Sequence, residues 1–503
     1  MNEGKTTRAR RVLVAQSYFL RFDPKLDDAG QPVPPLGSII CASVLRERGL
    51  DVRFFDAMLA GSESECAMAL DLHQPNALVI FEDSFNYLTK MCLGRMREAA
   101  VAMIGFARDR NIPVIVSGSD ASDDPEFFLR AGASAVAKGE GEFAVADWLE
   151  NPAAPAPAPG VIALDVDNQM VRGPARAVRG DLDSIPPPAW DLIDIGRYRG
   201  IWEKRHRRFS LPLATSRGCP FHCNWCAKPI WGQIHNTMSP SRAALEMEAL
   251  RRLGATHVNI VDDIFGLKPG WLEAFSYQIE QRDARLPFKC LSRADLLSAR
   301  AVSALVSAGC EMVWIGAESG AQSVLDAMEK GSTVEEIKEA AERLRQAGIK
   351  VGFFLQFGYP GETEADVEQT LRLVDDALPD DIGISVSYPL PGTRFHQRVK
   401  SEMDRDQRWR DSNDLAMLFH GPHSTRYYRR LHAYAHARFR LTGALRGPRA
   451  SGLTRPFRIL RYGLARVFWK AGLMAAARER EPLPSLLPGM SRARAATPAE
   501  PAS

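Results

Sequence analysis

The chain has 503 residues, too many for one ordinary domain, and a typical size of about 150 residues per domain suggests about three. Its composition is 45% hydrophobic and 25% charged, which excludes wholesale disorder and a disulfide-stapled miniature protein. The net charge of +3 is not that of a general polyanion binder, and no apolar run approaches the roughly 18 to 20 residues of a membrane span.

The N-terminal part, residues 10–150, is predicted to form an α/β unit. A short apolar run after the basic start predicts a first strand rather than a secretory signal, so we expect a cytoplasmic protein with reduced cysteines. Apolar strand patterns alternate with helical ones, as is typical of a parallel sheet. The predicted strands are 11–19, 51–57, 75–83 and 112–120, with a short fifth unit at 131–142.

Residues 151–200 are predicted to connect two larger units. The Pro/Ala-rich stretch 151–160 should be extended and semi-rigid. A small hairpin over 161–173 and a proline-rich segment over 181–193 follow, and the latter should give a rigid entry to the next unit.

Three of the eight cysteines are clustered, as Cys219, Cys223 and Cys226 in RGCPFHCNWCAKP. Three thiolates within eight residues suit a soft-metal site for zinc or for iron and sulfur. A buried cysteine stripe on a helix is the first alternative, although Arg-Gly-Cys-Pro is typical of a loop that leaves a strand. A structural zinc site is the second, and it would need a fourth ligand, for which His222 and His235 are the candidates.

Downstream of the cysteines, residues 201–400 are predicted to form a second α/β unit. Six apolar strand patterns alternate with helical ones, which favours an α/β barrel or an open parallel sheet. In both folds ligands gather at the C-terminal ends of the strands. The predicted strands are 211–218, 256–265, 288–297, 311–320, 349–362 and 380–393.

Those strand ends carry an unusual number of polar side chains. Each one alone could be a helix cap or a solvated loop residue, but together they mark a candidate ligand site. A guanidinium such as that of Arg293 could pair with a ligand carboxylate. The candidates, in chain order, are Asp262, Asp263, Arg293, Glu318, Ser319 and Gln356, followed by Ser387 and Tyr388.

The CX3CX2C spacing, with Trp225 just before the last cysteine, resembles the radical S-adenosylmethionine (SAM) superfamily. The resemblance implies that Cys219, Cys223 and Cys226 hold a [4Fe-4S] cluster whose open iron binds SAM. It also implies reductive cleavage of SAM to a 5′-deoxyadenosyl radical, with electrons from a flavodoxin- or ferredoxin-type donor.

By position, the resemblance assigns contacts with SAM to the strand ends. Asp262 and Asp263 would lie at the SAM amino group and Glu318 near the ribose, with Trp225, Ser319 and Gln356 beside them. The Gly-Gly-Glu usual at the second strand is Val-Asp-Asp here.

The N-terminal unit is similar to the cobalamin-binding domain that precedes the barrel in one radical SAM class. The matching pieces are Pro35-Leu36-Gly37, the loop of Gly118 and Ser119, and the loop of Gly139 and Glu140. Glycines in such loops let the backbone approach a large planar ligand. The Asp-x-His-x-x-Gly motif of many cobalamin domains is absent, which implies a cobalt without a histidine ligand or a domain that binds none.

The C-terminal part is strongly basic. Residues 421–480 contain 14 Lys and Arg against one acid, Glu479. We expect a basic helical region over 401–480 and a disordered tail over 481–503. The stretch around Leu460, Leu464, Val467 and Phe468 is amphipathic, and it either packs on the catalytic unit with its arginines outward or lies on the anionic inner face of a membrane.

The predicted fold is therefore α/β, with a Rossmann-like cobalamin-type domain, a partial (β/α)6 radical SAM barrel and a basic helical region.

The leading hypothesis is C-methylation of an unactivated carbon in a small-molecule or lipid-like substrate, with cobalamin as a third cofactor. An oxidative cyclase similar to the anaerobic magnesium-protoporphyrin IX monomethyl ester cyclase is the first alternative. A non-catalytic iron–sulfur or zinc protein is the second, and a tRNA-modifying enzyme would normally bring a second cluster motif. No nucleic-acid partner is expected.

Overall fold

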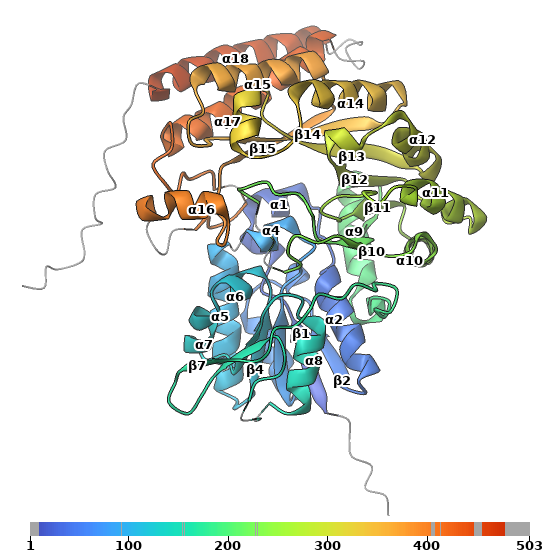
Figure 1. The fold of residues 1–503 in the computed structure, drawn as a ribbon, viewed down its shortest axis with the longest axis vertical. Coiled ribbons are helices and arrows are strands. Elements are labelled where there is room, and N and C mark those ends of the chain that lie inside the picture. Colours follow the sequence, from blue (N-terminus) through green and yellow to red (C-terminus); the bar gives the residue numbers. More distant parts are fainter. Residues whose placement is uncertain are drawn as a thin grey trace, which may run out of the picture.

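A computed structural model describes residues 10–91, 93–152, 154, 156–226, 228, 230–403, 408–412, 414–446 and 455–477. Two α/β units lie against each other, and a pair of long helices covers the far side of the second unit (Figure 1). Among the described helices, none is both long enough and apolar enough to cross a bilayer.

The N-terminal unit is built on a seven-stranded sheet in the order β2-β1-β3-β4-β5-β6-β7. The first five strands in this order are parallel, as the alternation of strand and helix predicted. Apart from the edge strand β2, these short strands are apolar and almost wholly buried, as expected of a sheet covered on both faces. They are β1 (Arg11–Ala15), β2 (Asp51–Phe55), β3 (Ala77–Phe81), β4 (Val114–Ser117) and β5 (Ala135–Ala137).

Helices cover both faces of this sheet and create two apolar cores. One core contains residues of α3 and α5, and the other contains residues of α2 and α8. The helices of this unit are α1 (Pro24–Ala29), α2 (Leu36–Glu47), α3 (Ser64–His73), α4 (Tyr87–Lys90), α5 (Gly94–Arg108), α6 (Ser119–Asp123), α7 (Pro125–Arg130) and α8 (Glu142–Glu150).

The hairpin expected within the linker belongs to the first sheet. Its strands β6 (Val161–Leu164) and β7 (Met170–Arg172) add to β5 in antiparallel fashion. The hairpin therefore extends the first sheet and is not part of a linker between two units. The helix α9 (Ile195–His206) then leads into the second unit.

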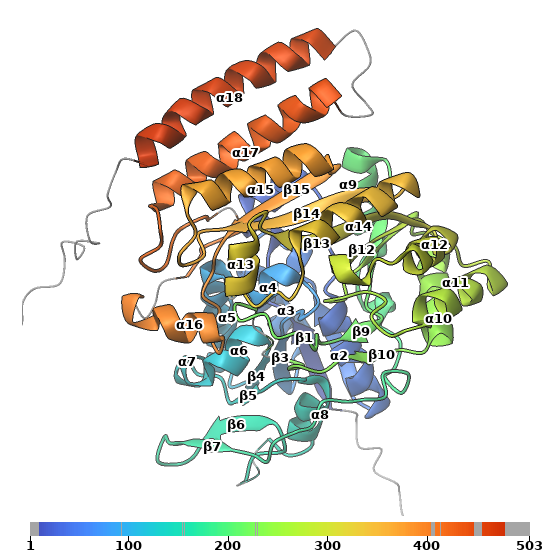
Figure 2. The same ribbon diagram turned by 45° about the horizontal axis from the view of Figure 1, so that its top comes forward.

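The second unit contains six parallel strands in chain order, β8-β11-β12-β13-β14-β15, and its sheet is curled but not closed (Figure 2). This is the predicted partial (β/α)6 barrel. The strands are β8 (Ser210–Leu213), β11 (His257–Ile260), β12 (Phe288–Ser292), β13 (Cys310–Glu318), β14 (Lys350–Phe357) and β15 (Asp381–Val386). A two-stranded ribbon, β9 (Ser216–Arg217) with β10 (Asn236–Thr237), flanks the cysteine segment.

Helices follow these strands and cover the outer face of the curled sheet. Several begin at side-chain caps, and α14 and α15 each carry a full capping box, at Thr333 and Thr363. The helices are α10 (Pro240–Arg252), α11 (Trp271–Gln281), α12 (Ala299–Ala308), α13 (Gln322–Ala327), α14 (Val334–Gln346), α15 (Glu364–Ala377) and α16 (Arg394–Val399).

The predicted basic helical region consists of α17 (Thr425–Arg446) and α18 (Arg455–Ala477), which pack side by side at the outside of the molecule (Figures 1 and 2). The apolar stripe of α18 faces outward, while the helix itself packs against α17 through its other side, as the packed alternative expected. Leu460, Leu464, Val467 and Phe468 are 62–70% exposed, whereas Trp469 and Leu473 pack inward. The tail over 481–503 lies outside the described residues.

Candidate functional site

The cysteine loop leaves the first barrel strand through a tight turn at Gly218. This residue has φ +85°, and a Cβ there would lie 2.3 Å from the carbonyl oxygen of Ile234. Only glycine fits both the backbone conformation and the close approach. Cys219, Cys223 and Cys226 follow at the carboxyl end of the half-barrel, and each is partly exposed.

Asp262, at the end of β11, holds the start of this loop. Its carboxylate accepts hydrogen bonds from the backbone N–H of Thr215 (2.6 Å) and Ser216 (3.1 Å) and from the Thr215 hydroxyl (2.5 Å). Burial raises the pKa of Asp262 to about 6, although these hydrogen bonds oppose the shift. In this structure the carboxylate is therefore engaged by the loop rather than presented to a ligand.

Asn224 anchors the middle of the loop, and sequence reasoning missed it. Its side-chain amide donates to the carbonyl oxygen of Ala327 (2.8 Å) and accepts from the hydroxyl of Tyr359 (2.8 Å). Its backbone N–H donates to the carbonyl oxygen of Met328 (3.0 Å). The loop between the second and third cysteines is thus fixed by two backbone carbonyl groups that follow β13 and by the side chain of Tyr359 after β14.

Asp263 lies close to the cysteines and is paired across the unit boundary. Its carboxylate forms a 2.6 Å ion pair with Lys90 of α4, and the Lys90 ammonium lies 5.3 Å from the ring centre of Trp231. Burial, followed by the negative charges of Asp263 and Cys219, raises the pKa of Cys226 to about 12. The thiols therefore need a positively charged partner before they become thiolates.

Glu318 ends β13 in a strained conformation. Its φ is +59°, at an irregularity in the register with β14, and it forms a buried 2.9 Å ion pair with Lys330. Left-handed backbone at a non-glycine residue is uncommon and often marks functional sites. Nearby, the hydroxyl of Ser319 hydrogen-bonds to that of Thr370 (3.0 Å), so it serves the local turn.

Gln356 lies at the end of β14 and is buried. Its side-chain amide donates to the hydroxyl of Ser387 (3.0 Å), which links the last two strands of the half-barrel. Trp225, in the cysteine loop, packs against an apolar cluster that includes Met328 and Tyr359. Its indole N–H is buried and has no hydrogen-bond partner among the described residues.

Arg293, after β12, is fully engaged by the protein. Its guanidinium contacts the Asp295 carboxylate through two N–H groups (2.9 and 3.2 Å) and donates to the carbonyl oxygen of Lys330 (2.9 Å). The same group stacks 3.8 Å from the ring centre of Phe221, inside the cysteine loop. Arg293 therefore positions the loop in this structure. Its N–H groups are already used within the protein, so it does not present a free pair of them to a ligand carboxylate.

A buried charge cluster joins the two units directly before the cysteines. Arg217 pairs with both Glu140 and Glu142 of the N-terminal unit, at 2.9 Å for Glu142, and all three side chains are at most 5% exposed. Glu140 also accepts a hydrogen bond from the backbone N–H of Arg179 (2.7 Å). Glu140, predicted as a cobalamin contact, is thus committed to this cluster.

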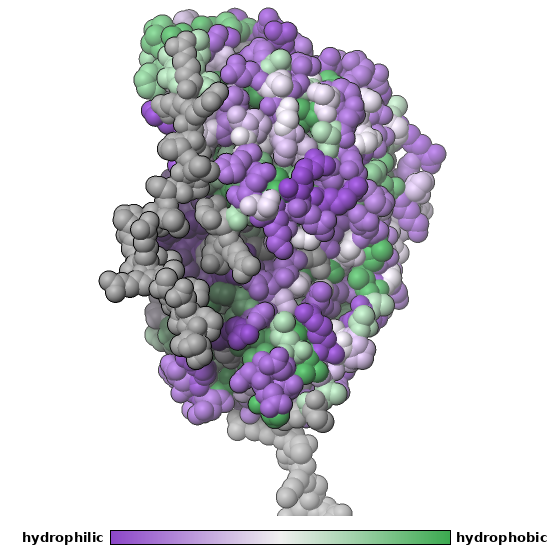
Figure 3. Space-filling view, turned by 60° about the vertical axis from the view of Figure 1, so that its left-hand side comes forward, coloured by the Kyte–Doolittle hydropathy of each residue, from purple (hydrophilic) through white to green (hydrophobic). Residues whose placement is uncertain are grey.

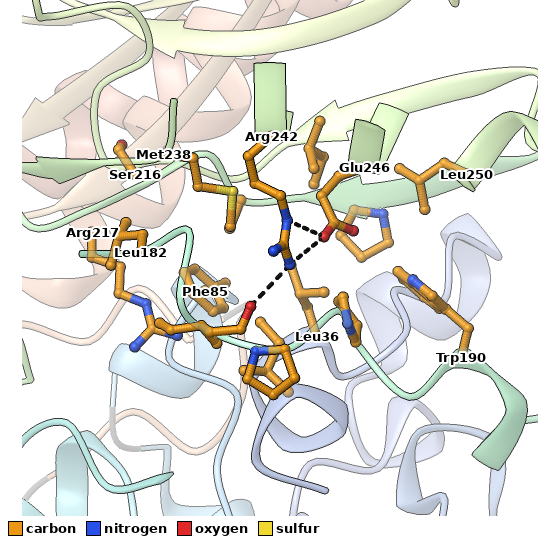
Figure 4. A pocket seen from close by; sticks show the side chains of 17 residues that line it. Leu36, Phe85, Leu182, Trp190, Ser216, Arg217, Met238, Arg242, Glu246 and Leu250 are labelled. Atoms are coloured by element: carbon orange, nitrogen blue, oxygen red, sulfur yellow. Dashed lines mark hydrogen bonds and ion pairs between the residues drawn. The ribbon is translucent and has the colours of Figure 1, made fainter. Parts of the chain in front are cut away.

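Beside this cluster, the seam between the units is closely packed. Its pocket of about 20 Å³ is lined by apolar residues of α2 and of the barrel entrance, and Arg242 bridges Glu246 and the carbonyl oxygen of Ile185 (Figure 4). Such a volume holds about one water molecule and no cofactor.

The carboxyl edge of the N-terminal sheet carries buried polar atoms without partners among the described residues. They are both amide atoms of Gln16 after β1, one carboxylate oxygen of Glu82 after β3, and the hydroxyl of Ser119 after β4. Burial raises the pKa of Glu82 to about 7. Gly118 has φ +147°, and a Cβ there would meet the Cβ of Glu82 at 2.6 Å.

These orphaned groups form a polar cradle, defined by Gln16, Glu82, Gly118 and Ser119. Unpaired buried polar atoms are costly, so their concentration at one sheet edge points to a ligand. Ligands of open α/β sheets bind at this edge, next to the point where strand order reverses, which here lies between β1 and β3. The predicted Gly118 and Ser119 belong to the cradle, whereas Gln16 and Glu82 were missed because isolated polar residues carry no motif.

Tyr87 of the N-terminal unit lies near the cysteine loop. It belongs to α4 of the N-terminal unit, and burial of its hydroxyl and the nearby charges of Cys226, Glu318 and Tyr388 raise its pKa above the usual range. The residue nevertheless keeps 57% of its surface accessible. The charges that act on its hydroxyl place Tyr87 near the cysteine loop.

Among the described residues, no three His, Cys, Asp or Glu side chains converge on a point that would hold a single metal ion. Cluster-bound thiolates ligate different iron atoms, so a cluster does not need such convergence. Three cysteines on a loop held by Asp262, Asn224 and Arg293 match the donor set of an iron–sulfur cluster that keeps one iron open.

Comparison with known proteins agrees with this geometry. Residues 213–374 match the radical SAM superfamily. The chain contains a radical SAM domain. A domain of this superfamily is catalytic, so the protein is an enzyme, as predicted from the cysteine motif.

Two curated relatives extend the similarity beyond this domain. An uncharacterised methyltransferase of Pyrococcus horikoshii is 26% identical over 374 residues, which are 73% of this chain and 78% of that protein. The anaerobic magnesium-protoporphyrin IX monomethyl ester cyclase of Cereibacter sphaeroides is 27% identical over 250 residues, or 49% of this chain and 40% of the cyclase.

Two solved structures share the fold of both units. The cobalamin-dependent SAM radical enzyme OxsB superposes with a TM-score of 0.70 at 16% identity, covering 93% of this chain and 72% of OxsB. The radical SAM methyltransferase TsrM from Kitasatospora setae, solved with cobalamin and a [4Fe-4S] cluster, gives 0.65 at 17% identity, with 78% and 75% covered. The predicted fold class is therefore confirmed.

Proposed function

We propose that this radical SAM enzyme uses cobalamin to methylate a carbon of a small-molecule substrate. The proposal rests on the polar groups at the carboxyl edges of the two sheets. The cysteine loop lies at the carboxyl edge of the half-barrel, and the polar cradle lies at the carboxyl edge of the N-terminal sheet. Arg217 and the Lys90–Asp263 pair connect them. A cluster with SAM on one side and a methyl-carrying corrinoid on the other would supply radical formation and the methyl group.

In this proposal the chain holds three cofactors with three sets of residues. Cys219, Cys223 and Cys226 would ligate the [4Fe-4S] cluster. The cradle, with the Gly139 loop beside it, would hold cobalamin without a histidine ligand. Gln16 and Ser119 offer a donor and acceptors for the corrinoid side chains, because their polar atoms are buried and unpaired.

The strand-end residues divide into positioning and contacting groups. Asp262 and Arg293 would orient the cysteine loop, because their polar atoms are already used for that purpose. Asp263, Glu318 and Gln356 would face SAM, with Glu318 held by Lys330 in its strained conformation. Tyr87 would line the space where the substrate meets both cofactors and would exclude water from it.

Cobalamin binding can be tested independently of the reaction. Protein reconstituted anaerobically with hydroxocobalamin should keep a corrinoid absorption spectrum through gel filtration. Gln16→Leu should weaken retention at least tenfold, because an apolar side chain there cannot hydrogen-bond the ligand. Gln74→Leu, at a surface position on the same unit, is the matched control. A colourless protein with an intact cluster would reject the proposal.

The cyclase alternative is favoured by the similarity to the Cereibacter enzyme over half the chain. The two reactions differ in the fate of the SAM methyl group. With methyl-labelled SAM, a reductant and a small-molecule extract of the producing cells, methylation should place label in a new product. Label that remains in SAM or methionine while the extract is altered would identify the cyclase reaction instead.

The partners in this proposal are an external flavodoxin- or ferredoxin-type electron donor and an anionic membrane surface. The membrane contact would be made by the exposed stripe of α18, formed by Phe457, Leu460, Leu464, Val467 and Phe468. Figure 3 shows the corresponding hydrophobic patch at the upper end of the molecule. Arg455, Arg461 and Lys470 are the exposed charges of this helix, and neither α17 nor α18 contains an acid.

This charge pattern suits a bilayer with anionic lipids, because apolar side chains enter the interface while cations meet the headgroups. The protein should co-sediment with phosphatidylglycerol vesicles but not with phosphatidylcholine vesicles. Phe468→Glu should reduce binding at least tenfold, whereas Leu72→Glu, at an exposed leucine of α3, should not. Dimerisation abolished by Phe468→Glu, without vesicle binding, would show that a second copy covers the stripe.

A further inference from the structure

A cavity of about 560 Å³ lies on the opposite side of α18 from the exposed stripe. It is open to solvent and is bounded by the last strand of the half-barrel, by one face of α17 and by α18, with one residue from α1. Its volume lies within the range of small-molecule sites, about 300–1,000 Å³. The lining residues are Lys25, Ile382, Gly383, Ile384, His432, Ala433, His436, Ala437, Arg440, Arg461, Tyr462, Ala465 and Trp469.

The cavity covers the free edge of β15, away from the proposed radical chemistry. This strand is the last in the sheet order, and Ile382 to Ile384 occupy its first half. The residues assigned to the cysteine site follow the other end of the strands, about 10 Å further along at 3.3 Å per residue. The cavity is therefore a separate site within the described part of the chain.

The cavity lining carries positive charges and no negative ones. Lys25, Arg440 and Arg461 line it, no Asp or Glu does, and none of the three cations forms an ion pair with a described residue. The carboxylate of Asp381, which is close enough for Arg440 to lower its pKa against the effect of burial, does not line the cavity. Three clustered cations repel one another, and an anion between them would relieve that cost.

Two histidines stand beside these cations. The rings of His432 and His436 lie 4.5 Å apart between centres. Burial and the positive charges of Lys25 and Arg440 lower the pKa of His432 to about 4 and that of His436 to about 3. Both rings are therefore neutral near pH 7, so each can offer one N–H donor to an anion.

The remaining walls are apolar or aromatic. Trp469 and Tyr462 of α18 face the alanines of α17 and the isoleucines of β15 across the cavity. We propose that this cavity binds an anion-headed amphiphile, a molecule with a carboxylate or phosphate head at the cations and an apolar or aromatic body against Trp469. The head would meet Lys25, Arg440 and Arg461, and the body would cover the free edge of β15.

Isothermal titration of the full-length chain tests this site with defined probes. Decyl phosphate below its micelle concentration should bind at one molecule per chain. Inorganic phosphate and decanol, which each carry half of the chemistry, should bind at least tenfold more weakly. Comparing dihexanoyl phosphatidic acid with 1-naphthoate then distinguishes a lipid from a soluble aromatic acid, and the tighter of the two names the source. Failure of all anionic amphiphiles to bind overturns the proposal.

Variants separate this site from general charge attraction. Arg461→Gln should weaken binding of decyl phosphate at least tenfold, whereas Arg466→Gln on the same helix, outside the lining, should leave it unchanged. Ala465→Trp fills the cavity without altering charge and should abolish binding. Equal losses in Arg461→Gln and Arg466→Gln, or full binding by Ala465→Trp, would contradict the assignment. None of these residues belongs to the cysteine site, so the result is independent of the proposed reaction. Arg461 is also one of the exposed cations of α18, so Ala465→Trp, which alters no charge, is the variant that separates this site from the membrane contact.

Discussion

Replacing Arg217 with methionine should loosen the junction between the two units and the cysteine loop together. The change leaves Glu140 and Glu142 buried without their cation, in a place where solvent screens little. Breaking a buried pair by removing one partner typically costs about 3–5 kcal/mol. We expect the lower half of that range, because Glu140 keeps the hydrogen bond from Arg179 and one carboxyl can take up a proton.

This loss can be measured by hydrogen–deuterium exchange of peptides covering residues 210–220, together with urea unfolding. About 3 kcal/mol corresponds to more than a hundredfold faster opening, at about 1.4 kcal/mol per tenfold. The triple variant with Glu140→Gln and Glu142→Gln should recover most of the loss, since no charge is then left unpaired. Arg48→Met, which breaks only exposed ion pairs, should cost less than about 1 kcal/mol. Unchanged exchange in Arg217→Met, or an equal loss in the triple variant, would refute this reasoning.

Three further predictions concern single positions. Asp262→Leu removes the acceptor of the N–H groups of Thr215 and Ser216, so iron content after reconstitution should fall at least twofold, and full iron content would contradict its positioning role. Gly118→Ala should lower the free energy of unfolding in urea by about 1–3 kcal/mol, because the new Cβ would clash with Glu82 and alanine is strained at this φ. An unchanged midpoint of urea unfolding would show that the loop can shift. Burial raises the pKa of Glu362 to about 8, so the folded state binds an extra proton and its stability should decrease as pH rises from about 5 to 8. Glu362→Gln should flatten this decrease, and parallel pH curves for the two proteins would contradict it.

The repeating elements of this fold could be predicted from the sequence because their signal is local. Each strand is a short apolar run and each helix has its own caps, as at Thr333 and Thr363. The cysteine motif is equally local. The hairpin over 161–173 can be predicted as a hairpin, but nothing in its own residues shows that it pairs with β5.

The contacts that build the site are not local, so the sequence could not reveal them. Arg217 and Glu140 are 77 residues apart, and Lys90 and Asp263 are 173 apart. No spacing rule connects such pairs, and only the folded units bring them together. For the same reason Arg293 and Asp262 could be placed at the strand ends, while their engagement with the cysteine loop could not be foreseen.

The central claim is that Cys219, Cys223 and Cys226 carry a cluster that cleaves SAM. Its most direct test is the formation of 5′-deoxyadenosine by anaerobically reconstituted protein with SAM and a strong reductant. The wild-type chain and Cys66→Ala, at a buried cysteine of α3, should both form the product. Cys226→Ala should form none. A wild-type protein with a full cluster that leaves SAM intact, or a Cys226→Ala variant that still cleaves it, would contradict the account.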